Sequence, residues 1–357
     1  MSHPSTRENN FDLIRLVAAA QVAIIHVASA PHVDFEKSVF IVFAQHLRGV
    51  PIFFVVSGFL ISLSWERNSV PIAYARNRIL RIYPALWVCL LVSIATAYVF
   101  GGVSFARMEA IPWLVAQLTI GQFYNPDFLR GYGTGVLNGS LWTIPVELQF
   151  YVLLPFLYRF FRLRDQRGNW SLIGLAMVSV AVQYLFVHLG GPASEHLLVK
   201  LLGVSIAPYF WIFLLGVLLQ RNFERLSSFL VGKGGAWLAI YALFVAGEDI
   251  LGVQATTNTP NPIPMAVLAC TIIACAYSAP KVAGWLLRGN DVSYGVYIYH
   301  VVVLNVFLAL GMQNSIGALV YVLATTLAAA TASWILVERP ALRVKRNPLH
   351  AVGKGAE

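Results

Sequence analysis

The chain has 357 residues, of which 58% are hydrophobic and 11% are charged, and its mean hydropathy is +0.69. Soluble domains carry about 25% charged residues, so this composition excludes an ordinary soluble domain and predicts an all-α, polytopic integral membrane protein. The formal net charge of +9 would suit a nucleic-acid partner, but the basic residues lie in the segments between apolar runs. There they report membrane topology and contact anionic lipid, so we expect no nucleic-acid partner.

The apolar runs predict about ten membrane-spanning helices, because a span needs about 20 mostly apolar residues. They cover roughly residues 11–29, 45–64, 82–100, 144–161, 171–189, 200–219, 235–252, 264–280, 292–311 and 316–337. With the N-terminus in the cytoplasm, most of the 25 lysines and arginines fall in inner segments, as the positive-inside rule requires. Both termini are therefore predicted to be cytoplasmic. We expect a single transmembrane domain over residues 1–345 and a short basic cytoplasmic tail over residues 346–357.

The first run carries charge that a bilayer normally rejects, namely Asp12, Arg15 and His26. A charged side chain near the centre of a span costs about 3 kcal/mol on insertion scales. Arg15 and His26 fall on one helix face, ~16 Å apart along the axis. Each has an ordinary explanation alone, since Arg15 could reach lipid headgroups and His26 the outer interface. Their shared face favours a functional role.

Two further sites place charge at or within predicted spans. Arg78 and Arg81 open the third run and share a helix face. They suit boundary anchors, but two guanidinium groups on one face also suit a phosphorylated donor. Glu147 lies about one turn inside the fourth run, with Tyr151 on the same face. A carboxylate at that depth needs a partner or a proton, which favours a polar cavity over lipid exposure.

Other stretches have more structural explanations. Ser57 and Gly58 in the second run indicate close helix packing. His300 shares a face with Ser293 and Tyr297 and lies ~12 Å into its span, where a buried hydrogen bond to another span is slightly favoured over catalysis. The outer segment 101–143 is predicted to hold an amphipathic or re-entrant piece at 111–115, a flexible glycine-rich loop at 131–135 and a functional lid.

The cysteines and histidines follow no metal-ligand or disulfide spacing. Cys89, Cys270 and Cys275 all fall within predicted spans. We expect them to be free and reduced, and we expect neither a bound metal nor a bound cofactor.

Together the charged motifs resemble integral-membrane acyltransferase family 3, the sugar O-acetyltransferase-like group. The resemblance covers most of the chain and is strongest over the first 155 residues. It rests on Arg-x10-His at Arg15 and His26, Phe-Phe-x-x-Ser-Gly-Phe-Leu at Phe53 to Leu60, Arg-x-x-Arg at Arg78 and Arg81, Ser-Leu-Trp-x-x-x-x-Glu at Ser140 to Glu147, and Ser-Tyr-Gly-x-Tyr-x-x-His at Ser293 to His300.

The resemblance implies transfer of an acyl group, usually acetyl from cytoplasmic acetyl-coenzyme A, to a carbohydrate hydroxyl at the outer face of a bacterial cytoplasmic membrane. A thioester donor needs no metal, whereas a hydroxyl needs a base near neutral pH, a task that suits histidine. We therefore expect His26 to remove the acceptor's proton and Glu147 to orient the imidazole or the sugar. Arg78 and Arg81, with Arg15, would bind the donor phosphates. The expected substrate cavity is lined by Ser57, Trp142, Tyr151, Tyr297 and His300.

Two other classes of function suit the same composition. A transporter or flippase of a lipid-linked saccharide would also need a polar cavity, although no internal repeat of the kind common in transporters is evident. An idle membrane scaffold would leave the Arg15–His26 face without a purpose. The acceptor also stays open between cell-envelope glycans and a macrolide-type small molecule, and so do the acyl chain, direct transfer against an acyl-enzyme, and the oligomeric state.

Overall fold

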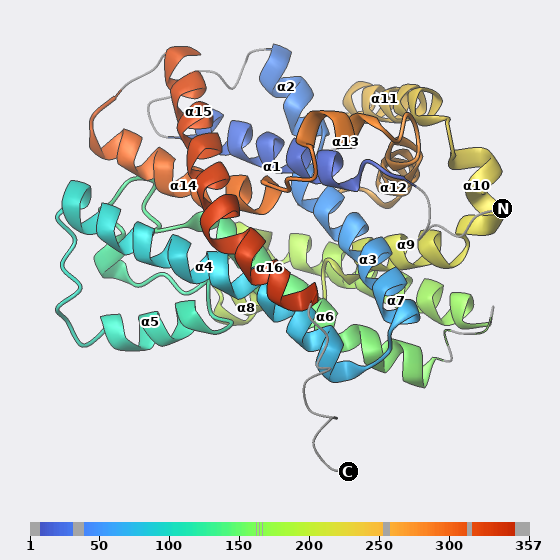
Figure 1. Cartoon of the computed structure of the whole chain (residues 1–357), viewed down its shortest axis with the longest axis horizontal. Coiled ribbons are helices and arrows are strands. Elements are labelled where there is room, and N and C mark those ends of the chain that lie inside the picture. The colour runs from blue at the N-terminus through green and yellow to red at the C-terminus, as the bar shows by residue number, and fades with distance from the viewer. Residues whose placement is uncertain are drawn as a thin grey trace, which may run out of the picture.

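The structure is a computed structural model that describes residues 8–30, 39–161, 163, 165, 167–252, 258–312 and 316–346. Over these residues it consists of helices and connecting turns without any β-strand (Figure 1), so the all-α prediction is confirmed. The predicted tail 346–357 lies, apart from Arg346, outside the described residues.

The helices in chain order are α1 (Phe11–Ala28), α2 (Val39–His46), α3 (Gly49–Arg67), α4 (Pro71–Gly101), α5 (Ala110–Leu118), α6 (Thr143–Phe160), α7 (Gly168–His188), α8 (Leu197–Gly203), α9 (Phe210–Arg221), α10 (Phe223–Leu230), α11 (Gly234–Ile250), α12 (Pro262–Ala276), α13 (Val282–Leu287), α14 (Ser293–Ala309), α15 (Ile316–Ser333) and α16 (Arg339–Arg346). A π-helical turn, Trp334–Glu338, joins α15 to α16. Short 3-10 turns cover Asp127–Leu129, Gly139–Trp142 and Gly191–Ala193.

Six helical segments of the described chain are long and apolar enough to cross a membrane, or seven if the bent pair α10–α11 forms one span. This establishes an integral membrane protein, while the count of ten spans and the side of each terminus stay predictions. Three shorter apolar helices, α9, α12 and α14, overlap the remaining predicted runs.

Two of the predicted spans, 200–219 and 82–100, differ most from the helices of the structure. The run 200–219 is broken, because α8 ends at Gly203 and α9 begins at Phe210. The run 82–100 is too short, since α4 begins eleven residues earlier at Pro71. Proline fits the first turn of a helix, where its missing N–H has no intrahelical partner, and this places Arg78 and Arg81 inside a long helix.

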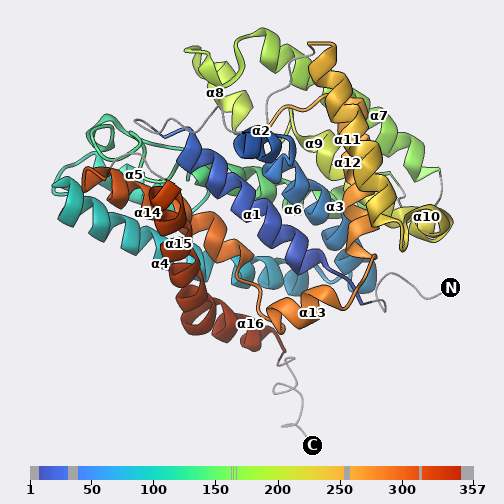
Figure 2. The same cartoon turned by 90° about the horizontal axis from the view of Figure 1, so that it is seen from above.

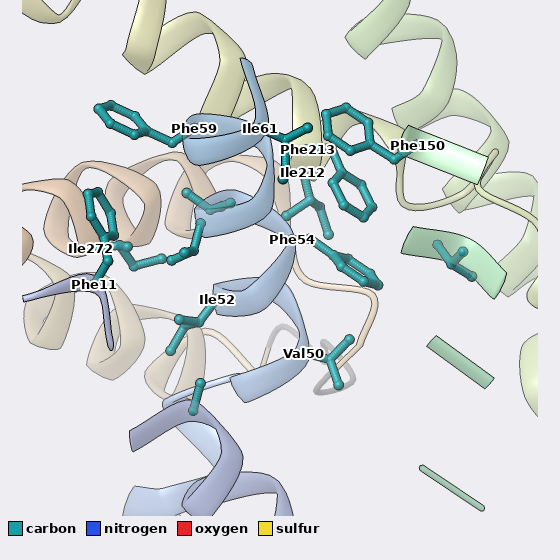
Figure 3. Close-up of a cluster of buried hydrophobic side chains, with 14 of the residues drawn as sticks. Phe11, Val50, Ile52, Phe54, Phe59, Ile61, Phe150, Ile212, Phe213 and Ile272 are labelled. Atoms are coloured by element: carbon teal, nitrogen blue, oxygen red, sulfur yellow. The ribbon is translucent and has the colours of Figure 1, made fainter. Parts of the chain in front are cut away.

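The centre of the protein is the close packing of α3 against α9. A Cβ atom at Gly58 would lie 2.0 Å from the backbone oxygen of Phe213, and one at Gly216 would lie 2.2 Å from that of Val55. The ring of Phe213 stacks on Phe54 and on Phe150 of α6, with 4.4 Å between centroids in each pair (Figure 3). The prediction of close helix packing at Gly58 is therefore confirmed.

Helix α1 crosses the middle of the protein between α3 and α14 (Figure 2). Its buried alanines, Ala18, Ala19 and Ala23, are fully inaccessible, because small side chains let neighbouring helices approach closely. The face of α1 that carries Arg15 and His26 therefore lies against α14 and the residues just before it.

The segment 101–143 folds back along α4, while its side of the membrane and its amphipathic or re-entrant character stay predictions. Tyr83 and Trp87 of α4 donate hydrogen bonds to the carbonyl oxygens of Thr119 and Leu118, at 2.9 and 3.1 Å. Trp87 lies fourteen residues before the end of α4 at Gly101, which corresponds to ~21 Å along the helix. Helix α5 therefore runs beside α4 (Figure 1), and its C-terminal end reaches the middle of α4.

The glycine-rich stretch 131–135 packs against α14. Gly133 has φ +56° and its Cβ position lies 2.2 Å from Oδ1 of Asn305, so only glycine fits there. Asn305 accepts a hydrogen bond from the backbone N–H of Thr134 at 2.9 Å and donates one to the carbonyl of Val136 at 2.9 Å. The stretch expected as a free loop is thus bonded to a buried side chain.

Candidate functional site

Two cavities meet at Arg78 of α4. The larger has a volume of about 1570 Å³ and lies between α4, the end of α5, α6 and the junction of α9 with α10. The smaller, of about 290 Å³, lies between α1, α3, α4, α6 and the start of α14. Arg78 and Tyr151 line both cavities, so these two side chains stand where the cavities adjoin.

The guanidinium of Arg78 has aromatic neighbours and no carboxylate partner among the described residues. It lies 5.8 Å from the ring centroid of Tyr74 and 5.7 Å from that of Tyr151. Its Nε is buried without a described hydrogen-bond partner. An uncompensated guanidinium beside a cavity is well suited to bind an anion, above all a phosphate.

The other two predicted donor-binding arginines are occupied by acidic residues. Asp291 lies 2.5 Å from Arg81 and 3.3 Å from Arg15, and Arg15 also binds Asp12. Glu338, in the π-helical turn, lies 3.7 Å from Arg81. The structure therefore separates the arginines that the sequence treated alike: Arg15 and Arg81 are paired with carboxylates, while Arg78 has no carboxylate partner among the described residues.

Asp291 is the site residue that sequence reasoning missed. Burial by itself raises its pKa, but the guanidinium groups of Arg15 and Arg81 outweigh burial and hold the pKa below its ordinary range. Ser293 adds a hydrogen bond from its backbone N–H to Oδ1 at 3.3 Å. The one sequence signal for Asp291 was its position two residues before the Ser293–His300 motif. Nothing in the local sequence indicates that it forms ion pairs with Arg15 and Arg81.

Glu147 faces the smaller cavity and is held by two hydroxyl groups. Ser57 of α3 donates a hydrogen bond to its Oε1 at 2.6 Å, and Tyr151, one turn along α6, donates to the same oxygen. Ser57 thus does more than pack helices together, because it fixes the carboxylate. The expectation that Glu147 lines a polar cavity rather than facing lipid is confirmed.

Tyr297 of α14 closes one wall of the smaller cavity. Its hydroxyl bonds with that of Thr143 at 2.6 Å and donates to the carbonyl of Ser140 at 2.8 Å. The segment before α6 is thereby joined to α14. Trp142 and His300 were both expected in the cavity wall, but neither lines either cavity. Trp142 instead packs on Tyr209 with 5.3 Å between ring centroids, and His300 is fully buried.

His26 and His300 form a direct pair. Nδ1 of His26 lies 2.7 Å from Nε2 of His300, and the rings stack with 5.0 Å between centroids. His300 is fully buried, and its ring lies 6.0 Å from that of Tyr297. The hydrogen bond to another span that the sequence favoured for His300 is present, and its partner is the predicted base.

His26 and Glu147 do not contact each other among the described hydrogen bonds and ion pairs. The expected direct orientation of His26 by Glu147 is therefore absent, because each residue already has its own partner. Tyr297 lines the cavity that holds Glu147 and packs edge-on against His300. Arg78 and Glu147 thus line the same cavity, and Tyr297 connects that cavity with the histidine pair.

Comparison with known proteins identifies relatives over nearly the whole chain. The model of a family described as acyltransferase domain matches residues 8–338. Nodulation protein 10 of Rhizobium leguminosarum bv. viciae is 33% identical over 97% of this chain and 96% of its own length. The O-acetyl transferase of Shigella phage Sf6 is 25% identical over 93% and 96%, and the exopolysaccharide production protein ExoZ of Rhizobium meliloti is 26% identical over 87% and 94%. No solved structure matches.

Proposed function

This chain belongs to the acyltransferase family whose model it matches, and on that premise we propose that it transfers an acyl group from acyl-coenzyme A to a carbohydrate hydroxyl. We take acetyl as the acyl group, cell-envelope polysaccharide as the acceptor, and a bacterial cytoplasmic membrane as the location. The donor would enter from the cytoplasm, and the acceptor would react near the outer face.

The unpaired guanidinium of Arg78, where the two cavities adjoin, is the observation that supports acyl-coenzyme A as the donor. Acyl-coenzyme A has a phosphorylated end and a long thioester arm. A free guanidinium at the junction of a large and a small cavity suits both parts. The phosphates would bind beside Arg78 in the larger cavity, and the arm would extend into the smaller one.

The chemistry of transfer needs a base and an activated acyl group. Nε2 of His26 would take the proton of the acceptor hydroxyl as its oxygen bonds to the thioester carbonyl carbon. The carbon–sulfur bond then breaks, and the departing thiolate receives the proton from His26. Glu147, held by Ser57 and Tyr151, would accept hydrogen bonds from the substrates.

The names of the relatives support the acceptor class. One is named an O-acetyl transferase and another an exopolysaccharide production protein, which favours transfer of acetyl to oxygen on a polysaccharide. A macrolide-type acceptor stays an alternative under the same chemistry. A transporter or flippase of a lipid-linked saccharide is disfavoured, because residues 8–338 match an acyltransferase domain.

The test uses membranes that contain the full chain, radiolabelled acetyl-coenzyme A and purified cell-envelope glycans. We expect label in a glycan with the parent and with His188→Ala, an exposed histidine at the end of α7, but not with His26→Ala. Sealed vesicles of known orientation locate the donor side. Equal label with the parent and with His26→Ala would show that His26 is not the base. If the parent neither transfers the acetyl group nor hydrolyses the donor, the proposal is contradicted.

A further inference from the structure

The His26–His300 pair joins two helices that are far apart in the chain, α1 and α14. Their facing nitrogens, Nδ1 of His26 and Nε2 of His300, lie 2.7 Å apart. At this distance one nitrogen must carry the shared proton and the other must offer a lone pair. Which one donates decides whether the remaining nitrogen of His26 can act as a base.

The backbone of α14 settles the direction of this bond. Nδ1 of His300 lies 3.3 Å from the carbonyl oxygen of Val296, and a carbonyl can only accept. Nδ1 of His300 therefore carries a proton, and a neutral imidazole has only one. Its Nε2 must then accept, so the shared proton belongs to Nδ1 of His26, and Nε2 of His26 is left with its lone pair.

The surroundings keep His300 neutral. His300 is fully buried, and among the described residues no carboxylate forms an ion pair with either ring. The described polar and ring contacts of His300 other than His26 are with the carbonyl of Val296 and the ring of Tyr297, and neither carries a charge. A buried imidazolium without a compensating charge is costly, so passing the proton on to His300 is unfavourable.

We propose that His300 is the positioning residue of the acyl transfer: it holds His26 in the tautomer whose Nε2 is unprotonated. This inference rests on the proposed function, because it assigns the base that the transfer requires. His300 takes the place that an orienting third group has in a nucleophile–base–orienter arrangement. Being neutral, it supplies orientation and tautomer selection rather than charge.

The test compares kinetics of the full chain with variants of His300. In His300→Ala the hydrogen-bond acceptor is lost, and we expect kcat to fall about 10- to 100-fold, within the range that general base catalysis contributes, with the KM for the donor unchanged. In His300→Gln the side-chain oxygen can accept from His26, and we expect it to recover most of the loss. Val302→Ala, at a buried position on the same helix, is the control for the empty space that an alanine substitution leaves, and it should keep the parental kcat.

A spectroscopic measurement separates this inference from the proposed function. With ¹⁵N-labelled histidine, the parent should show His26 protonated at Nδ1 and unprotonated at Nε2, and His300→Ala should show a mixture of tautomers. Parental kcat in His300→Ala, or a proton on Nε2 of neutral His26 in the parent, would overturn the inference. An absence of acyl transfer by the parent would instead refute the proposed function, while the tautomer measurement still decides the geometry.

Discussion

The carboxylate of Asp291 lies 2.5 Å from the guanidinium of Arg81, so a residue just before α14 neutralises an arginine that the sequence assigns to the donor. Asp291 also binds Arg15 at 3.3 Å. Charged groups inside a membrane protein are usually paired in this way. The consequence is that one arginine, Arg78, remains as the charged group at the junction of the two cavities.

Replacing Arg78 with glutamine tests this distinction. We expect Arg78→Gln to raise the KM for acetyl-coenzyme A about 10- to 100-fold, because a hydrogen bond to a charged group contributes about 1.5–3 kcal/mol. Steady-state kinetics in membranes measure it. Arg130→Gln, at an exposed arginine directly after the turn Asp127–Leu129, should leave the donor KM unchanged, and an equal rise in both variants would contradict the assignment of Arg78.

Asp291→Asn should act on stability rather than on donor binding. Removing one partner of a buried ion pair costs about 3–5 kcal/mol, since Arg15 and Arg81 would then lack their shared carboxylate. We expect a lower unfolding temperature in detergent for Asp291→Asn. Asp127→Asn, at a fully exposed aspartate, should unfold like the parent.

The same carboxylate predicts how acid affects stability. Arg15 and Arg81 outweigh burial and lower the pKa of Asp291 from 3.8, so its contribution is complete above that value and is lost as the pH falls through the lower folded-state pKa. The unfolding temperature of the parent should therefore decrease below about pH 4. Asp291→Asn should show a shallower decrease over that range, and parallel curves would contradict the contribution of Asp291.

Glu147→Gln should abolish most acyl transfer without unfolding the protein. The amide keeps the shape of the carboxylate but removes the charge and one acceptor oxygen for Ser57, Tyr151 and substrate. We expect kcat to fall about 100-fold or more, as is found when a group that stabilises the transition state is removed. Ser57→Ala should show a smaller loss, because Tyr151 still holds the carboxylate. A larger loss for Ser57→Ala than for Glu147→Gln would reverse these roles.

Gly58→Ala should loosen the packing of α3 against α9. The added methyl group would lie 2.0 Å from the backbone oxygen of Phe213, which neither helix can accommodate without a shift. Overpacking costs about 1–3 kcal/mol, so the unfolding temperature should decrease. Gly174→Ala, with no atom within 4 Å of its Cβ position, is the matched control and should not be destabilised.

The location of most long helices, and the presence of charged residues in a cavity between them, were predictable from local sequence. Apolar runs interrupted by charge located the helices, and the spacing from Arg15 to His26 placed both residues on one face of α1. Glu147 could be assigned to a cavity because a lone carboxylate is costly in lipid. Helix bounds were less predictable: the run 200–219 is broken between α8 and α9, since continuous hydrophobicity does not require a continuous helix.

The sequence by itself determined that this is a helical membrane protein with charge inside its spans, because hydropathy, spacing and motif order are properties of the chain alone. Only the tertiary structure decided the partners of that charge: Asp291 with Arg15 and Arg81, Ser57 with Glu147, and His300 with His26. The physical reason is that these bonds join residues from different helices. Their pairing depends on how α1, α3, α4 and α14 pack, which no local pattern specifies.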